Sequence, residues 1–492
     1  MKKYNKIIAS SIFILLMALS FNSCSDEFLD NTKEYNIDSE NYFNSEDDYY
    51  KALVGAYDLL QSTYVNVMLG EIASDNSLCG GESATDVIGF QQIDDMNHTP
   101  VNSNLRDVWN WMFAGVNRAN YILEFKDKTD FNGKNVIIAE ARFLRAYYHF
   151  ELVKWFGGIP LKGDARFQLG DEKSIPRSSV AEVYASIEAD LQYAVDNLSY
   201  ISPQVGRANK GSAQALLGKA YLYQNKFTEA ATVLENLINN GPFDLVQNYN
   251  TIFEHVGENG IESVFEVQYT DVEGAGFGCL QCSEGNVAVG FNGIRNYNGP
   301  EFDSGFSFNV PVQEAYDAFD ADDLRRDVAI LDINAWATST GATFTEGFEH
   351  TGFYNRKYIA RKGDLNTGDP NLTNPNNYRS IRFADVLLMA AEALNRGGIS
   401  DGRAQQYLNR VRRRAFGDTN HDINDTGTTL TQAIYNERRL ELVGEGHRFF
   451  DLVRTGNGTA IPGFTPNKNE LFPIPIEEIQ FSNGNWSQNP GY

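Results

Sequence analysis

Apolar residues recur at the spacing of an amphipathic helix along most of this chain. Over residues 139–155 they stand three or four positions apart, and Gly157 and Pro160 follow where the pattern ends. Residues 180–198 repeat the same spacing. Because one face of an α-helix returns every 3.6 residues, both stretches predict helices that bury one side. We therefore predict a mainly α-helical fold with a few short strands.

A repeat signature follows. With Gly218 as the small residue at the eighth position of a 34-residue tetratricopeptide unit, other signature positions are filled as well. These residues are Leu217, Tyr221, Ala230, Leu234 and Pro242. The turn of the unit is predicted at residues 225–226, and a looser version, with its turn at residues 397–398, spans residues 383–414. We expect tetratricopeptide-like helical hairpins at about 139–240 and 382–456, stacked as a short superhelix that serves as a scaffold.

Two stretches break this pattern. Residues 64–104 and 271–309 are rich in Gly, Asn and Asp, carry isolated aromatic residues and have no sustained period. Irregular segments of this length in a compact protein are usually functional or disordered. Their aromatic content argues against simple linkers, so we predict that both are ligand-binding loops. Trp109 and Trp111 are assigned instead to the core.

The first residues have the pattern of an export signal. Lys2, Lys3 and Lys6 precede an apolar run over residues 7–21, which is too short for a stable bilayer span. Residues 22–25 resemble a bacterial lipobox, so we predict a leader at residues 1–23 and acylation of Cys24. Several acyl chains, palmitate among them, would anchor the protein firmly. The alternative is an ordinary secretory signal with a chance cysteine.

The composition of the chain indicates what kind of protein the lipid anchor would hold at the membrane. The chain has 492 residues, of which 42% are hydrophobic and 13% aromatic, and residues 24–492 are predicted to form one large domain. The formal charge of −24 repels phosphate backbones, so nucleic acid is not expected as a partner. Acidic residues at 26–27 resemble a sorting mark for the outer face of the outer membrane in some Gram-negative bacteria.

Three cysteines remain after Cys24. Cys279 and Cys282 have the spacing of a redox or zinc pair, but no second pair completes a zinc site. In an oxidising compartment a structural disulfide is expected, either within this pair or from Cys79 to one member of it.

Sequence strings that suggest catalysis or metal binding fail on their context. Residues 398–402 match G-x-S-x-G, but they join two predicted helices, whereas a nucleophile elbow follows a strand. The acidic stretch 418–425 has Ile423 where a calcium loop needs glycine. No H-E-x-x-H motif is present. We predict no catalytic residue, no metal and no cofactor.

The carboxyl-terminal motifs resemble those of a known family. Residues 436–442 read NERRLEL, residues 445–456 read EGHRFFDLVRTG, and residues 471–475 and 488–492 resemble the family's ending. Further matches are residues 139–148, residues 382–385 and the helix that holds Trp109, Phe113 and Asn120. By these motifs the chain resembles the SusD/RagB family over essentially its whole mature length. The charged residues of the 437–451 motif are expected to form ion pairs at helical spacing, and His447 to pack or hydrogen-bond.

The resemblance implies a function. Members of this family are outer-membrane lipoproteins that capture oligosaccharides and close as a lid over a TonB-dependent transporter resembling SusC, without cleaving the ligand. A peptide-capturing lid, as in the RagB branch, is the second hypothesis. A surface glycoside hydrolase is the third, because an acidic chain could place two carboxylates around a glycosidic bond.

A sugar ring has an apolar face and a rim of hydroxyls, so its site needs aromatic platforms and hydrogen-bonding side chains. The predicted loops contain both. The candidates are Asp75, Asn76 and Phe90 in the first loop, Asn292, Arg295 and Tyr297 in the second, and Trp336 in a separate irregular stretch.

Overall fold

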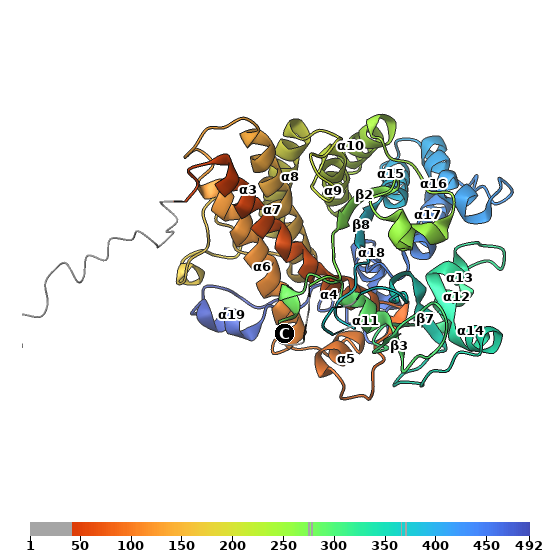
Figure 1. Ribbon diagram of the computed structural model, residues 1–492. Coiled ribbons are helices and arrows are strands. Elements are labelled where there is room, and N and C mark those ends of the chain that lie inside the picture. The colour runs from red at the N-terminus through yellow and green to blue at the C-terminus, as the bar shows by residue number, and fades with distance from the viewer. Residues whose placement is uncertain (1–41, 274–275, 277–278, 366, 370) are drawn as a thin grey trace, which may run out of the picture.

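The computed structural model describes residues 42–492 except 274–275, 277–278, 366 and 370. The predicted leader, the predicted lipid on Cys24 and the acidic residues 26–27 lie outside the described residues. Helices form most of the described chain, which confirms the predicted fold class (Figure 1). Among these helices, none combines the length and the apolar character that crossing a bilayer requires.

The elements have the following bounds. The α-helices are α3 (Glu46–Asp58), α4 (Tyr64–Ile72), α5 (Ile88–Asp94), α6 (Ser103–Glu124), α7 (Lys134–Phe156), α8 (Val180–Asn197), α9 (Lys210–Tyr223), α10 (Phe227–Asn240), α11 (Ala288–Asn292), α12 (Gln313–Asp317), α13 (Arg326–Ala329), α14 (Ile333–Thr340), α15 (Phe383–Arg396), α16 (Asp401–Phe416), α17 (Gly427–Leu442), α18 (Arg448–Arg454) and α19 (Ile476–Phe481). The strands are β1 (Ser77–Leu78), β2 (Ser263–Val267), β3 (Ile294–Arg295), β4 (Ser304–Gly305), β5 (Val310–Pro311), β6 (Ile330–Asp332), β7 (Phe353–Asn355) and β8 (Tyr378–Arg382). The 3₁₀ helices are η2 (Leu59–Thr63), η3 (Asp171–Lys173), η4 (Tyr249–Phe253), η5 (His255–Gly257), η6 (Leu280–Cys282), η7 (Arg356–Tyr358) and η8 (Gly458–Ala460).

The long helices pack on one another in a continuous row. α6 packs on α7, α7 on α8, α8 on α9 and α9 on α10. α10 then packs on α15, which follows it only after the long irregular part of the chain, and α15 packs on α16 and α17. The two predicted groups of hairpins are therefore joined side by side in one scaffold.

The predicted tetratricopeptide unit is confirmed as α9 and α10. Asn225 adopts a positive φ of 59° in the turn between them. A Cβ atom at Gly218 would lie 2.4 Å from Cδ2 of Leu234 on α10, so only glycine permits this approach of the two helices. Two of the signature positions, Gly218 and Leu234, thus lie where the two helices of the hairpin touch.

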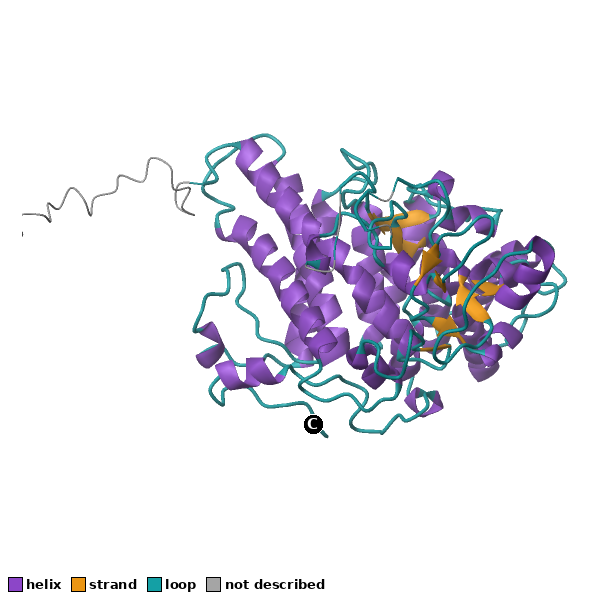
Figure 2. Ribbon diagram, turned by 60° about the horizontal axis from the view of Figure 1, so that its bottom comes forward, coloured by secondary structure: helices purple, strands orange, loops and turns teal. Residues whose placement is uncertain are grey.

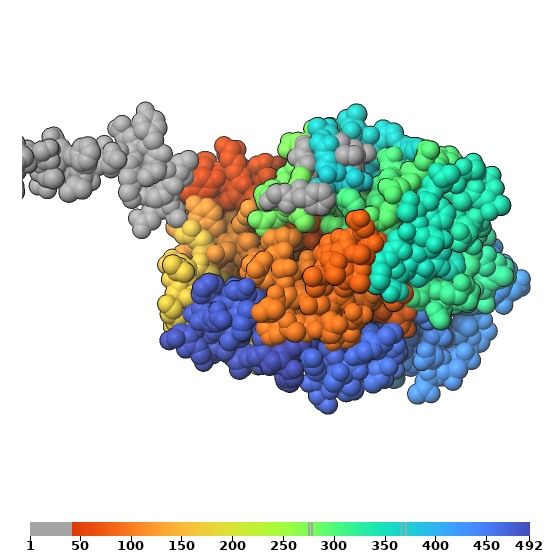
Figure 3. Space-filling model, turned by 90° about the horizontal axis from the view of Figure 1, so that it is seen from below, coloured from red at the N-terminus to blue at the C-terminus, as the bar shows by residue number. Residues whose placement is uncertain are grey.

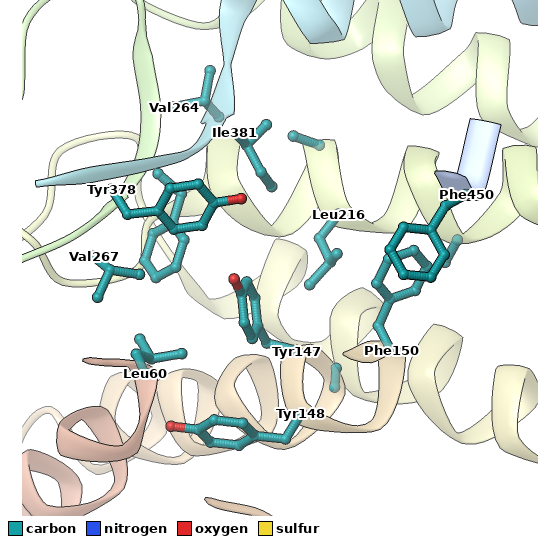
Figure 4. Packing of buried hydrophobic residues seen from close by; sticks show 14 of the residues in the cluster. Leu60, Tyr147, Tyr148, Phe150, Leu216, Val264, Val267, Tyr378, Ile381 and Phe450 are labelled. Atoms are coloured by element: carbon teal, nitrogen blue, oxygen red, sulfur yellow. The ribbon is translucent and has the colours of Figure 1, made fainter. Parts of the chain in front are cut away.

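The core centres on α7, which is buried along most of its length. Figure 4 shows Tyr147 pointing from α7 toward β8 and Tyr148 pointing toward α3. The Tyr148 hydroxyl donates a 2.6 Å hydrogen bond to the Ala56 carbonyl of α3, and the Tyr147 hydroxyl lies 2.9 Å from that of Ser380 in β8. α7 therefore connects the helical row to the antiparallel pair β2–β8.

The strands lie together in one half of the molecule, among loops and short helices (Figure 2). They form pairs rather than an extended sheet: β1–β5, β2–β8, β3–β4 and β6–β7. A second hydrophobic cluster, which includes Ile294, Tyr297, Phe302 and Tyr354, is buried there. Part of this region departs from the prediction, because residues 64–72 and 88–94 of the first predicted loop are the helices α4 and α5.

The charged residues of the carboxyl-terminal motif pair only partly as predicted. Glu441 on α17 accepts hydrogen bonds from Arg325, Arg382 and Arg414, which belong to other parts of the chain. The expected pairing at helical spacing is found for Asp451, which pairs with Arg454 on α18, but not for Glu441, whose buried side chain faces neighbouring elements. The motif is therefore a cross-link between segments.

Two predictions about apparent functional residues are confirmed. His447 is buried, its Nδ1 atom lies 3.3 Å from Nζ of Lys219, and burial lowers the pKa of the imidazole to about 3. Ser400 of the G-x-S-x-G string lies between α15 and α16, where its hydroxyl accepts a hydrogen bond from the Arg403 amide. His447 packs, and Ser400 caps a helix.

Candidate functional site

The predicted ligand-binding residues fall into two groups in the structure. Asp75 and Asn76 follow α4 and contact α17 and α18. The other residues, in the loop-rich part of the molecule, are Phe90, Asn292, Arg295, Tyr297 and Trp336. The structure therefore does not bring all the candidates into one site.

Asp75 and Asn76 are held by arginines. Asp75 accepts two hydrogen bonds from Arg448, at 2.7 Å and 2.8 Å, and Asn76, which is fully buried, accepts one of 2.7 Å from Nε of Arg439. Burial acts to raise the pKa of the Asp75 carboxyl, but the hydrogen bonds from Arg448 and the charges of both arginines lower it. These contacts give both residues a structural role, and their contact with a ligand stays a prediction.

Phe90 and Asn292 are also buried. The ring of Phe90 packs edge-on against Phe291 and Phe308, with centroids 5.7 Å and 5.6 Å away. The Asn292 amide donates to the Ala288 carbonyl and accepts a 2.8 Å hydrogen bond from Asn309. Both side chains hold the surrounding loops in place, which is what an aromatic or amide residue in a long loop often does.

Tyr297 and Trp336 form one aromatic group with Phe302. Trp336 lies on α14, so the prediction that it belongs to an irregular stretch was wrong. Its indole Nε1–H donates a 2.8 Å hydrogen bond to the Tyr297 hydroxyl, which donates in turn to the Pro300 carbonyl. Tyr297 and Phe302 are buried, whereas Trp336 is half-buried. Of this group, Trp336 has the most ring surface available to a ligand.

Arg295 lies at the edge of the same region. Its Nη2 donates a 3.1 Å hydrogen bond to the Phe306 carbonyl and lies 3.7 Å from Oδ2 of Asp86. Its Nε has no hydrogen-bond partner among the described residues. Because Nε is buried, a ligand hydroxyl group would contact the exposed part of this side chain, which is 18% exposed, and the neighbouring Asp86 carboxylate.

Three segments meet at this edge. The Thr345 amide donates to the Arg295 carbonyl at 3.0 Å, and the Phe348 amide donates to the Gly81 carbonyl at 2.9 Å. We call the surface formed by residues 80–87, 295–298, 336 and 343–350 the loop face. Figure 3 shows the segment around α5 (orange) beside the segment that includes residues 330–350 (teal) on this side of the molecule. Backbone hydrogen bonds thus hold three distant parts of the sequence together.

The prediction missed three aromatic residues of the loop face. Phe344, Phe348 and His350 are half-buried and stand in the irregular stretch after α14. Both ring nitrogens of His350 lack a partner among the described residues, and burial lowers the pKa of this imidazole, which favours its neutral form. The signal was present, since residues 341–352 combine Gly, Thr and isolated aromatics as the two predicted loops do.

The chemistry of the loop face is that of hydrogen bonding and ring packing. Its acidic side chains, Glu82, Asp86, Glu346 and Glu349, belong to the same surface as one arginine, Arg295, and several aromatic rings. No group of His, Cys, Asp and Glu side chains that could hold a metal ion occurs in the part of the chain that the structure describes. Aromatic surface with a few converging polar groups fits the apolar face and hydroxyl rim of a sugar.

The cysteines take one of the two predicted pairings. Cys279 and Cys282 form a disulfide, and Cys79 is a free, buried thiol. Burial raises the pKa of Cys79, so its thiol stays protonated and unreactive at neutral pH. Cys79 precedes the loop face, and its backbone amide donates a 2.7 Å hydrogen bond to Asp94.

Comparison with known proteins identifies relatives of the whole described chain. A model of the SusD family matches residues 289–492, and a model described as "starch-binding associating with outer membrane" matches residues 27–222. SusD-like protein P2 of Formosa agariphila is 29% identical over 100% of both chains.

Solved structures agree with these matches. A laminarin-binding SusD-like protein superposes with a TM-score of 0.83 at 36% identity, over 92% of this chain and 100% of the other. Surface glycan-binding protein A from Bacteroides thetaiotaomicron, solved with laminarihexaose, gives a TM-score of 0.80 at 26% identity, over 90% of this chain and 99% of the other. With the motifs and the helical scaffold described above, these similarities show that the chain belongs to the SusD-like family.

Proposed function

We propose that this protein binds an oligosaccharide at the cell surface through its loop face and passes it, uncleaved, to a TonB-dependent transporter resembling SusC. The observation that carries the proposal is the similarity, at 36% identity over 92% of the chain, to a protein described as laminarin-binding. Laminarin-type oligosaccharides are therefore the first ligands to test.

The loop face supports binding at a defined place. Trp336 supplies an aromatic surface, while Arg295 and Asp86 supply a donor and an acceptor for hydroxyl groups. The segments that carry them are tied together by backbone hydrogen bonds, so the site is organised before the ligand arrives. Such preorganisation reduces the entropy that binding must overcome.

Calorimetry on the soluble protein without its leader tests this proposal. We expect laminarihexaose to bind and to be recovered at its original length by chromatography after prolonged incubation. Shortened products would establish the hydrolase hypothesis instead. Binding of peptides, with no binding to any member of a panel of glycans, would establish the peptide-capturing lid.

Delivery to a transporter needs the protein at the membrane. We propose that the lipid on Cys24 tethers it beside its partner, over which it closes as a lid. Purification from native membranes in mild detergent should recover a large barrel protein with it. Cys24→Ala should leave glycan binding intact and impair uptake by cells. Undiminished uptake with an exported, unlipidated protein would show that the lipid is incidental.

A further inference from the structure

A polar cavity of about 210 Å³ lies between α17 and the segment that runs from α18 to η8. Its charged lining residues are Arg438, Arg439, Arg448 and Asp451. Three cations and one anion therefore face this cavity, in a chain whose formal net charge is −24. Such a local excess of positive charge is unexpected from composition alone.

The single lining carboxylate is already neutralised. Asp451 accepts hydrogen bonds from Arg438 at 3.1 Å and from Arg454 at 2.8 Å. Arg438 donates a further hydrogen bond of 2.7 Å to the buried Asp385. The charges of Asp451 and Arg438 are thus neutralised by each other and by their neighbours. The excess positive charge of the cavity comes from Arg439 and Arg448.

Arg439 and Arg448 have one carboxylate between them. Arg448 binds both oxygens of Asp75, whereas Nη2 of Arg439 reaches Asp75 only at 3.9 Å. Arg439 donates its Nε–H to a neutral group, the amide oxygen of Asn76. Its Nη1 and Nη2 donate no hydrogen bond to any described residue.

The surroundings of Arg439 leave its charge undercompensated. Burial lowers the pKa of its guanidinium and the repulsion of Arg448 adds to this effect, while Asp75 and, more weakly, Glu71 and Glu314 oppose it. The side chain is only 21% exposed. A partly buried guanidinium has lost part of its hydration without gaining a full counter-charge. A bound anion would supply that charge and so compensate the free energy that burial of the cation costs.

The neutral lining residues indicate what the anion is attached to. Gln432, Tyr435, Asn436, Thr455 and Asn457 surround the arginines with amide and hydroxyl groups. These groups suit a polyhydroxylated ring, and the planar fork of arginine matches a carboxylate. The volume of 210 Å³ is below the range of about 300–1,000 Å³ for drug-sized ligands, which favours one ring over a chain.

We propose that this cavity binds an acidic monosaccharide unit, a uronic acid, with its carboxylate on Arg439. The site is separate from the loop face, on which no residue of this cavity lies. It provides the chain with a second carbohydrate subsite, selective for acidic sugars, whether or not the loop face binds laminarin-type ligands.

Calorimetry in low salt with glucuronate, glucose and acetate tests the proposal. We expect glucuronate to bind at least tenfold more tightly than either glucose or acetate, because it alone combines the carboxylate with the ring. Arg439→Gln should weaken glucuronate binding at least tenfold. Arg403→Gln, which removes an exposed arginine on α16, is the matched control and should change nothing. Equal affinity for acetate and glucuronate would overturn the role of the ring.

A second variant guards against misfolding. Asn436 is exposed at the cavity, and Asn436→Asp keeps the oxygen that accepts from Gln432 while it adds a negative charge. It should weaken glucuronate binding several-fold and leave the melting temperature nearly unchanged. The proposal is overturned if glucuronate does not bind the wild-type protein, or if its affinity survives both Arg439→Gln and Asn436→Asp.

Discussion

Nη2 of Arg414 donates a 2.7 Å hydrogen bond to Oε1 of Glu441, and both side chains are buried. The same carboxylate accepts from Arg382 of β8 at 2.8 Å and from Arg325, just before α13, at 2.9 Å. Glu441 therefore connects α17 to a helix, a strand and a loop. Burial acts to raise the pKa of the Glu441 carboxyl, but the three arginines lower it.

The first prediction concerns the stability that depends on this carboxylate. Glu441→Gln removes the charge on which Arg325, Arg382 and Arg414 converge. Removal of one partner from a buried ion pair leaves uncompensated charge, so we expect a loss of about 3–5 kcal/mol in the free energy of unfolding. Urea denaturation followed by circular dichroism measures this change.

The control is a carboxylate in an ion pair nearer the surface. Glu235 pairs with Arg403, whose side chain is 45% exposed, and Glu235→Gln should cost less than about 1 kcal/mol. A similar small loss for Glu441→Gln would show that the network adds little to stability and that its residues are retained for another reason.

The ion pairs also show where sequence reasoning reached its limit. Helical spacing correctly indicated helices with charged residues at the two ends of the 437–451 motif, which are α17 and α18, but it missed the turn at residues 443–447 and says nothing about partners elsewhere. Arg325 and Arg382 stand 116 and 59 positions before Glu441. Only the packing of the helical row brings them together, and one sequence does not encode that packing in a readable pattern.

The second prediction is a pH dependence that arises from His149. This imidazole is buried in α7, and burial and the charge of Arg145 lower its pKa to about 3, from 6.5 in a model peptide. Between these values the unfolded chain binds a proton that the folded protein does not. The free energy of unfolding therefore falls as the pH is lowered through this window, by up to about 1.4 kcal/mol per pH unit.

Unfolding of the wild type and His149→Gln at pH 7 and pH 5 tests this sign. The wild type should lose roughly 2 kcal/mol more than the variant between these two pH values. His255 provides a control of opposite sign, since the hydrogen bonds that its imidazole donates to the carboxylates of Asp364 and Glu258 raise its pKa to about 10. Its contribution is complete below pH 6.5 and is lost as the pH rises toward 10, so His255→Gln should not reduce the acid sensitivity.

The third prediction tests the close contact in the tetratricopeptide unit. Gly218→Ala places a methyl group 2.4 Å from Leu234, and this overpacking should destabilise the protein by about 1–3 kcal/mol. Gly402→Ala is the matched control, because nothing lies within 4 Å of its new methyl group. Within α16 this control should stabilise the protein by roughly 0.5–1 kcal/mol. Thermal melts measure both changes. If the melting temperature shifted in the same direction in Gly218→Ala and Gly402→Ala, the close contact between Gly218 and Leu234 would be contradicted.

The fourth prediction concerns the thiols. In the soluble Cys24→Ala protein, Cys79 should resist alkylation until the chain unfolds, because it is buried and burial raises its pKa. Mass spectrometry should then find one alkylated cysteine after denaturation and three after reduction. Alkylation of all three cysteines without a reductant would exclude the Cys279–Cys282 disulfide.

The candidate site was less readable from the sequence than the scaffold. A helix repeats its apolar face every few residues, so α7, α8, α9 and α10 could be placed within a few positions. The loops have no such period, and the choice of Asn76, Phe90 and Asn292 rested on residue type alone. Their burial depends on contacts with residues far away in the sequence, whereas Phe344 and His350 stand in a stretch, 341–352, whose composition did mark it as a loop of the same kind.

The last prediction separates Trp336 from the other candidates, and it rests on the proposed binding of laminarihexaose. Trp336 is half-buried, whereas Tyr297 and Phe302 beneath it are buried. Loss of a large apolar contact costs about 1.5–3 kcal/mol, so Trp336→Ala should weaken binding roughly tenfold to a hundredfold in calorimetry.

Two further variants show whether a loss of affinity in Trp336→Ala is due to the lost aromatic ring. Trp336→Phe keeps a ring but loses the hydrogen bond to Tyr297, and it should retain most of the affinity if the ring itself is the platform. Phe481→Ala removes a matched aromatic side chain, 60% exposed on α19, and should leave binding unchanged. Unaltered affinity in Trp336→Ala would show that the oligosaccharide does not stack on this ring. The half-buried aromatics Phe344, Phe348 and His350, on the same loop face, would then be the next residues to replace.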